Sequence, residues 1–108
     1  MLSVRDDAPA FTAHHYTRYL GDLSGGQVIG RLLGRTYDLP AGSAGLAFYA
    51  FGAVPKPKRY KDAYRARLDA LPLDAAGRAE VVDEVCRAFE HNQRLLTALG
   101  DRHVPRPA

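Results

Sequence analysis

Residues 14–28 read HHYTRYLGDLSGGQV, and they decide the fold because they place three glycines inside a helical pattern that extends from residue 10 to residue 37. A glycine inside a helix costs about 1 kcal/mol relative to alanine, so Gly21, Gly25 and Gly26 together cost about 3 kcal/mol. Gly21 and Gly25 are four residues apart and leave one helix face without side chains. The same glycines can kink the helix. We therefore expect these glycines to have a role in packing or in ligand binding that outweighs the loss of helix stability.

Three interpretations of the glycines compete. In the first, the glycines permit close packing against other helices. Two sets at spacings of four residues fit this interpretation: the pair Gly21 and Gly25, and the series Gly26, Gly30 and Gly34. The second is a phosphate loop, which is disfavoured because no G-x-x-x-x-G-K-[ST] pattern and no preceding strand are present. The third places the bare face over a planar cofactor, and the polar stripe of His14, Arg18 and Asp22 beside Gly25 favours it. An ordinary salt bridge to Arg18 is the alternative explanation for Asp22.

Length and composition limit the classes of protein to which the chain can belong. The chain has 108 residues, 46% of them hydrophobic and 25% charged, which is typical of one globular domain or part of one. No apolar run approaches the ~20 residues that a membrane span needs, and the first seven residues do not resemble a signal peptide. Cys86 is the only cysteine, which excludes an intrachain disulfide, and we expect it to be buried. These features predict a cytoplasmic protein without a membrane partner.

The pattern along the chain predicts an all-α fold in a single, partial domain. The expected segments are a lead-in at 1–9, a kinked helix at 10–37, a loop at 38–57, helices at 58–71 and 74–100, and a tail at 101–108. Asp74 is expected to cap the last helix, and Gly100 is expected to end it. An apolar patch at 46–51 is either a short strand or a buried extended segment.

Basic residues concentrate in one segment. The net charge is only +3, but six of the fifteen Lys and Arg residues fall within 56–67, against one acid, Asp62. An anionic ligand or an acidic partner fits this local charge better than nucleic acid does, because no nucleic-acid recognition motif accompanies it. An ordinary solvated helix face is the alternative explanation for Lys61 and Arg65, which are four residues apart.

The stretch at 14–28 resembles the signature of the biliverdin-forming haem oxygenase family. The resemblance continues through 39–40, 45–51, 60–68 and 88–93, and so covers nearly the whole chain between Thr12 and about Leu99. It implies an all-α fold in which haem lies between a proximal helix and this distal helix. It also implies an enzyme that cleaves haem at the α-meso carbon to biliverdin, CO and ferrous iron. Haem is then both cofactor and substrate, O₂ is consumed, and a reductase or ferredoxin supplies electrons.

The resemblance also implies roles for individual residues. The catalytic set holds a water network that delivers a proton: Asp22, Arg18, Tyr19 and Asn92. Loss of the Asp22 carboxylate is expected to divert the reaction toward O–O cleavage, as in peroxidases. The haem-binding set combines residues at the haem face, contacts to the propionates and a residue at the haem edge: Tyr16, Gly21, Ser24, Gly25, Lys61, Arg65 and Phe89.

No metal ligand is assigned to the chain. The axial iron ligand of the family is a histidine on an upstream helix, and the histidines at positions 14, 15, 91 and 103 do not match that place. We expect that roughly the N-terminal half of the family domain is absent, so that the chain self-associates or binds a separate N-terminal half. A truncated haem oxygenase, one half of a split enzyme, a non-catalytic haem- or tetrapyrrole-binding remnant and a structural helical fragment all fit the sequence.

Overall fold

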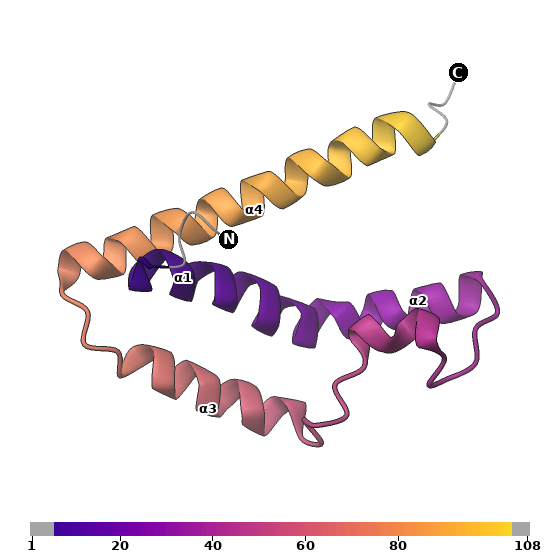
Figure 1. The fold of residues 1–108 in the computed structure, drawn as a ribbon, viewed down its shortest axis with the longest axis horizontal. Helices are drawn as coiled ribbons and strands as arrows, with labels where there is room; N and C mark the ends of the chain where they lie inside the picture. The colour runs from indigo at the N-terminus through magenta and orange to yellow at the C-terminus, as the bar shows by residue number, and fades with distance from the viewer. Residues whose placement is uncertain (1–5, 105–108) are drawn as a thin grey trace. The chain divides into compact units, whose positions relative to one another are not determined.

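A computed structural model describes residues 6–104, and every regular element in that range is helical (Figure 1), which confirms the expected all-α class. The chain divides into two compact units. One unit comprises the residues up to Thr17 together with those from Leu73 onward, and the other comprises residues 18–72. Within the described range, no helix has both the length and the apolar character that crossing a membrane requires.

In the first unit, α1 (Ala8–His15) packs beside α4 (Ala75–His103) (Figure 1). α1 begins inside the expected lead-in because the Asp7 carboxylate accepts a hydrogen bond from the backbone N–H of Ala10 at 3.0 Å, and because Pro9 is tolerated in the first turn. The buried residues of this unit are small, which brings the two backbones close together: Ala10, Ala13 and Ala88.

The ends of α4 show which capping signals operate. Asp74 caps the helix as expected, since its carboxylate accepts from the backbone N–H of Gly77 at 2.8 Å. The helix continues past Gly100 to His103, so the expected C-cap at Gly100 and the expected tail from residue 101 are wrong. Val104 is extended because it precedes Pro105, and this proline signal ends the helix. The remaining parts of the expected lead-in and tail, residues 1–5 and 105–108, lie outside the described residues.

The irregular stretch of the distal helix consists of two π-helical segments, η2 (Tyr16–Leu20) and η3 (Asp22–Gly26), followed by α2 (Gln27–Thr36). Gly21 separates the two segments and keeps helical backbone angles. π-Helical turns are rare and occur frequently at functional sites, because they change the direction in which side chains project.

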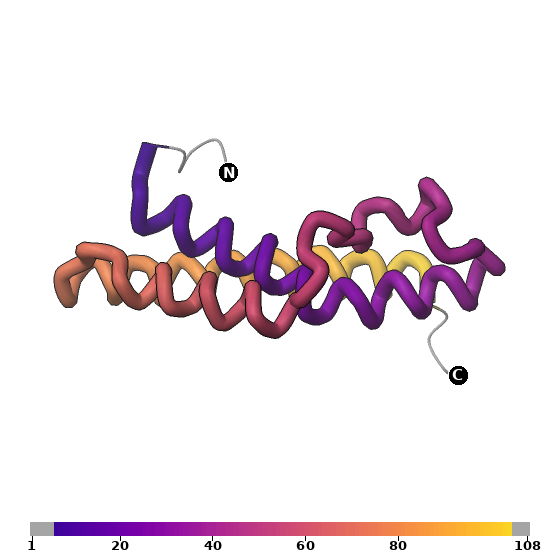
Figure 2. The backbone as a smooth tube through the Cα atoms, turned by 90° about the horizontal axis from the view of Figure 1, so that it is seen from below, coloured from indigo at the N-terminus to yellow at the C-terminus, as the bar shows by residue number. Residues whose placement is uncertain are grey.

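The second unit also contains a 3₁₀ helix that the sequence left open. The apolar patch forms η4 (Ala44–Tyr49), so it is not a strand, and the expected loop at 38–57 contains this short helix. η4 packs against α2 and η3 (Figure 2). α3 (Pro57–Asp69) begins with a proline in its first turn and ends before Leu71, which precedes Pro72.

Candidate functional site

The glycines of the distal helix fall into two groups. A Cβ atom added at Gly21 or at Gly25 would meet no atom within 4 Å. At Gly26 the added atom would lie 2.8 Å from Tyr49 Cδ1, and at Gly30 it would lie 3.1 Å from Tyr49 Cβ. Gly26 and Gly30 therefore let η4 approach the helix. The packing interpretation explains these two, whereas Gly21 and Gly25 leave the backbone bare.

Arg18 and Asp22 form the ion pair that their spacing indicates. Arg18 Nε donates to Asp22 Oδ2 at 2.9 Å, and the Asp22 side chain is only 22% exposed. The guanidinium carbon of Arg18 also lies 5.6 Å from the centre of the Phe48 ring, a cation–π distance. The carboxylate is thus held in one orientation next to Gly21, and its second oxygen, Oδ1, takes no part in this ion pair.

Tyr19 lies within an aromatic cluster. Its ring centre is 5.9 Å from that of Phe51 in an edge-to-face arrangement and 6.0 Å from that of Tyr60. Burial raises the pKa of the Tyr60 phenol above its ordinary value, and its hydrogen bond with Tyr19 raises the pKa further, while the positive charge of Arg67 lowers it. Tyr60 therefore stays protonated and connects α3 to the distal helix.

The basic residues of α3 have different surroundings. Lys61 Nζ donates to Ser24 Oγ at 3.5 Å, which joins α3 to η3. Arg65 Nη1 lies 3.6 Å from Asp62 Oδ1, and the same carboxylate accepts from Lys58 Nζ at 3.0 Å. Lys61 is therefore directed to the distal helix, whereas Arg65 is held by a neighbour on its own helix.

The comparisons with known proteins identify the family. The family model described as "Heme oxygenase" matches residues 3–98. The chain belongs to the haem oxygenase family. Heme oxygenase 1 of Homo sapiens is 40% identical over 97 residues, which cover 90% of this chain and 34% of the relative. The heme oxygenase of Takifugu rubripes is 49% identical over 87 residues, which cover 81% of this chain and 31% of the relative.

A solved structure has the same fold. Heme oxygenase-1 from the cyanobacterium Synechocystis, crystallised in complex with heme, is similar with a TM-score of 0.82 and 38% identity, covering 93% of this chain and 45% of that one. The expected haem oxygenase-like helical fold is thereby confirmed. The chain spans about a third of the length of the curated relatives and less than half of the solved structure.

Eight of the eleven residues expected at the haem oxygenase site lie in the unit formed by residues 18–72. The other three belong to the first unit: Tyr16, Phe89 and Asn92. Tyr16 is half-buried at the start of η2, whereas Phe89 and Asn92 are exposed on α4, with Phe89 at 55%.

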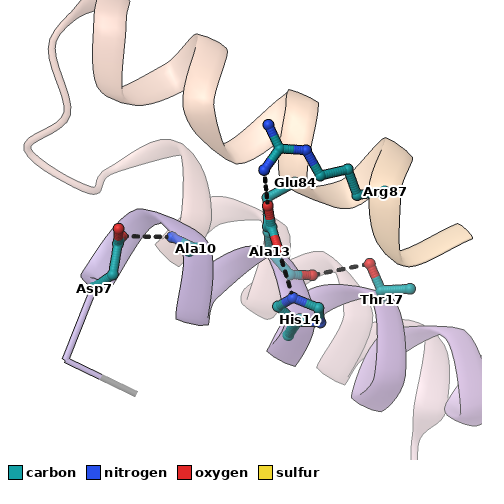
Figure 3. A network of polar contacts seen from close by, with 7 residues as sticks. All are labelled: Asp7, Ala10, Ala13, His14, Thr17, Glu84 and Arg87. Carbon is teal, nitrogen blue, oxygen red and sulfur yellow. Dashed lines mark hydrogen bonds and ion pairs between the residues drawn. The ribbon is translucent and has the colours of Figure 1, made fainter. Parts of the chain in front are cut away.

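His14, which was expected on the polar stripe with Arg18 and Asp22, has a hydrogen-bond partner on α4. His14 Nε2 is hydrogen-bonded to Glu84 Oε1 at 2.8 Å, and Glu84 Oε2 accepts from Arg87 Nη1 at 3.1 Å (Figure 3). In the same view, the Thr17 hydroxyl donates to the carbonyl of Ala13 at 2.9 Å. Because His14 and Glu84 are 70 residues apart, no local pattern could have indicated their contact.

Several other features were missed or mistaken. Tyr60 contacts Tyr19, and Arg18 lies over the Phe48 ring. Both aromatic residues lie in stretches that carry the family resemblance, but no spacing in the sequence indicated these contacts. Cys86 was expected to be buried but is exposed, since α1 covers only the face of α4 that carries Ala88. Among residues 6–104, no group of three His, Cys, Asp or Glu side chains could hold a metal ion.

Proposed function

We propose that this chain supplies the distal part of a haem oxygenase that cleaves haem at the α-meso carbon to biliverdin, CO and ferrous iron. The observation that carries the proposal is the bare helix face at Gly21 and Gly25, next to the ion pair of Arg18 and Asp22. Membership of the family supports haem as the substrate. A cytoplasmic location fits the single free thiol at Cys86, which a reducing compartment keeps from oxidation.

The residues of the site fit a planar macrocycle. Contact between a porphyrin and the backbone of a helix requires positions without side chains, and an added Cβ at Gly21 or Gly25 would occupy open space. Lys61 reaches the same helix through Ser24, and Arg65 lies one turn further along α3. Two cations suit the two haem propionates, because hydrogen bonds between charged groups are about twice as strong as neutral ones. The Tyr16 hydroxyl and the Phe89 ring complete the proposed binding set.

Asp22 is proposed to hold and move a proton. When bound, haem supplies the iron at which O₂ is reduced and the carbon that is oxidised. Arg18 fixes Asp22 Oδ2, which leaves Oδ1 to bind an ordered water and to relay a proton through it. Tyr19 and Asn92 are proposed to bind the same water network. A polar network of this kind favours proton delivery when each of its groups has a partner.

The proposal assigns the axial iron ligand and the electron donor to polypeptide other than residues 6–104. The relative crystallised with heme is more than twice as long as the part of it that this chain matches. We propose that the helices of that additional part form the side of the haem site opposite the distal helix. The proposed partners are a segment with the remainder of the fold, or a second copy of the chain, together with a reductase or ferredoxin. No role for nucleic acid or a membrane is proposed.

Haem reconstitution of the chain together with a separate segment that carries the remainder of the fold and its axial histidine, followed by reduction under air, tests the function. We expect a shifted Soret band on haem addition and the appearance of biliverdin when reductant is supplied. Bound haem without verdohaem or biliverdin would instead identify a non-catalytic haem-binding module. The absence of any Soret shift, even with imidazole added as an axial ligand, would contradict haem binding altogether.

The Asp22→Asn variant separates binding from proton delivery. It keeps the size of the side chain and removes the ionised carboxylate, so haem is expected to bind as in the parent chain. Biliverdin formation is expected to fall about a hundredfold or more, because a general acid–base contribution is about 10²–10⁴-fold. Asp69→Asn at the exposed end of α3 is the matched control. Equal biliverdin formation by both variants would exclude the proposed role of Asp22.

A further inference from the structure

A groove lies between α2 and the segment that follows it, and it contains none of the proposed haem-site residues. Its volume is about 680 Å³, within the range of pockets that bind small molecules. The close approach of η4 creates it, because Gly30 has no side chain and so admits Tyr49, while Leu46 lies beside Gly34. The groove is therefore a feature of the local fold around α2 and does not depend on the site at Gly21 and Gly25.

The charges along the groove are unbalanced. Arg31 and Arg35, four residues apart on α2, both line it, and Asp38 is the one acid among its lining residues. Among the described residues, neither guanidinium forms an ion pair or a side-chain hydrogen bond, in contrast to Arg18, whose charge is paired. Like charges at this spacing on a helix destabilise it, so a bound anion would remove an existing repulsion.

Apart from these charged residues and Gln27, the groove is lined by apolar side chains and glycines. Leu39, Leu46 and the Tyr49 side chain line it, next to the bare backbone of Gly30 and Gly34. Pockets for small molecules commonly combine a mostly apolar wall with a few polar groups that orient the ligand. Arginine is well suited to this orienting role, because its planar guanidinium donates two parallel hydrogen bonds to a carboxylate or a phosphate.

We propose that this groove is a second ligand site, which binds an organic oxyanion: a carboxylate or phosphate group carried on an apolar body. The oxyanion pairs with Arg31 and Arg35, and the apolar body lies against Leu39, Leu46 and Tyr49. The site is separate from the haem site and does not require the proposed oxygenase activity, so each can fail without the other.

Calorimetric titration of the full chain tests the site with three probes: 1-naphthoate, 1-naphthyl phosphate and inorganic phosphate. We expect at least one naphthyl probe to bind more tightly than inorganic phosphate, because only the naphthyl probes use the apolar wall. The two naphthyl arms show which oxyanion the arginines prefer. Binding of inorganic phosphate as tight as that of both naphthyl probes would overturn the proposal, since charge alone would then account for binding.

Variants locate the site. Arg31→Gln and Arg35→Gln are each expected to weaken binding about tenfold or more, the effect of losing one charge-assisted hydrogen bond. Arg59→Gln on α3 removes an equal charge from a residue that does not line the groove and should leave binding unchanged. Ala41→Phe fills the groove from an exposed position and should abolish binding while both arginines remain.

Circular dichroism establishes that each variant is folded. Equal loss of binding in Arg59→Gln and Arg31→Gln would show a diffuse charge effect and overturn the proposal. Retention of binding in Ala41→Phe would place the ligand elsewhere. A dissociation constant of 10 mM corresponds to a binding free energy of only about 3 kcal/mol. If neither naphthyl probe binds the parent chain at 10 mM, the proposal is overturned.

Discussion

Alanine substitutions along the distal helix test whether its glycines have the two different roles that the structure shows. Gly21 has helical backbone angles, φ −61° and ψ −50°, and open space where a Cβ would be. Gly21→Ala is therefore expected to increase the free energy of unfolding by about 0.5–1 kcal/mol, because alanine loses less conformational entropy than glycine on forming a helix. For a domain of this size, the gain corresponds to a melting temperature higher by about 2–8 °C.

Gly26→Ala should have the opposite effect. Its added methyl group would lie 2.8 Å from Tyr49 Cδ1, an aromatic ring carbon close to the backbone that cannot move aside without displacing η4. Overpacking of this kind costs about 1–3 kcal/mol, which exceeds the gain of about 0.5–1 kcal/mol from helix propensity. Gly26→Ala is thus expected to lower stability although it lies only one residue from Gly25, at which alanine should be tolerated.

Thermal and urea denaturation of the haem-free chain measure these differences, and haem titration measures the function of the same positions. Gly25→Leu should abolish the Soret shift, whereas Gly100→Leu, also at a helical glycine with no atom within 4 Å of an added Cβ, should preserve it. Destabilisation by Gly21→Ala as large as that by Gly26→Ala would refute the reasoning, because Gly21 would then be packed against another part of the protein in solution.

Three further predictions concern polar contacts. His14→Ala should lower the free energy of unfolding, measured by urea denaturation, by about 1–3 kcal/mol, because Glu84, whose side chain is only 15% exposed, loses a hydrogen-bond partner. His91→Ala, at an exposed histidine, should change the free energy of unfolding by less than about 0.5 kcal/mol. The negative charge of Asp7 raises the pKa of Glu80 above its ordinary value of 4.5. Protonated Glu80 therefore favours the folded state below pH 4.5, and this stabilisation is lost as the pH rises through the pKa that Glu80 has in the folded state. Glu80→Gln should therefore raise the melting temperature at pH 7 but not at pH 4, and an equal change at both would exclude this repulsion. Tyr60→Phe should remove a phenol whose pKa is raised above its ordinary value, which a spectrophotometric titration detects, and should cost about 0.5–1.5 kcal/mol of unfolding free energy below pH 10. Tyr37→Phe, at an exposed residue, should leave the unfolding free energy unchanged.

The sequence predicted the features that depend on neighbours along the chain. Asp74 and the following helix were predictable because a cap requires only a carboxylate and a backbone N–H three residues later. The ion pair of Arg18 with Asp22, which the sequence offered as the alternative explanation for Asp22, likewise depends only on a spacing of four residues. Gly100 shows the limit of such signals, since a glycine ends a helix only where the backbone leaves the helical region, and here α4 continues to His103.

The candidate site was predictable in part. Residues 14–28 indicated a bare helix face, and the structure shows open space at Gly21 and Gly25. The neighbours of that face were not predictable: Tyr60 contacts Tyr19 across 41 positions in the sequence, and only the path of the chain through η4 brings α3 to the distal helix. The π-helical turns also escaped prediction, because they depend on hydrogen bonds that no residue type specifies.

By itself, the sequence determined that this protein is helical, where most of its helices begin, and that it resembles haem oxygenases, because these properties follow from residue types at short spacings. Only the tertiary structure decided which glycines are packed and which are bare. Gly25 and Gly26 are adjacent and chemically identical, and what distinguishes them is the ring of Tyr49, more than twenty residues away, which faces one of them and not the other. A glycine's role depends on what occupies the space of its missing side chain, and distant residues determine that occupant.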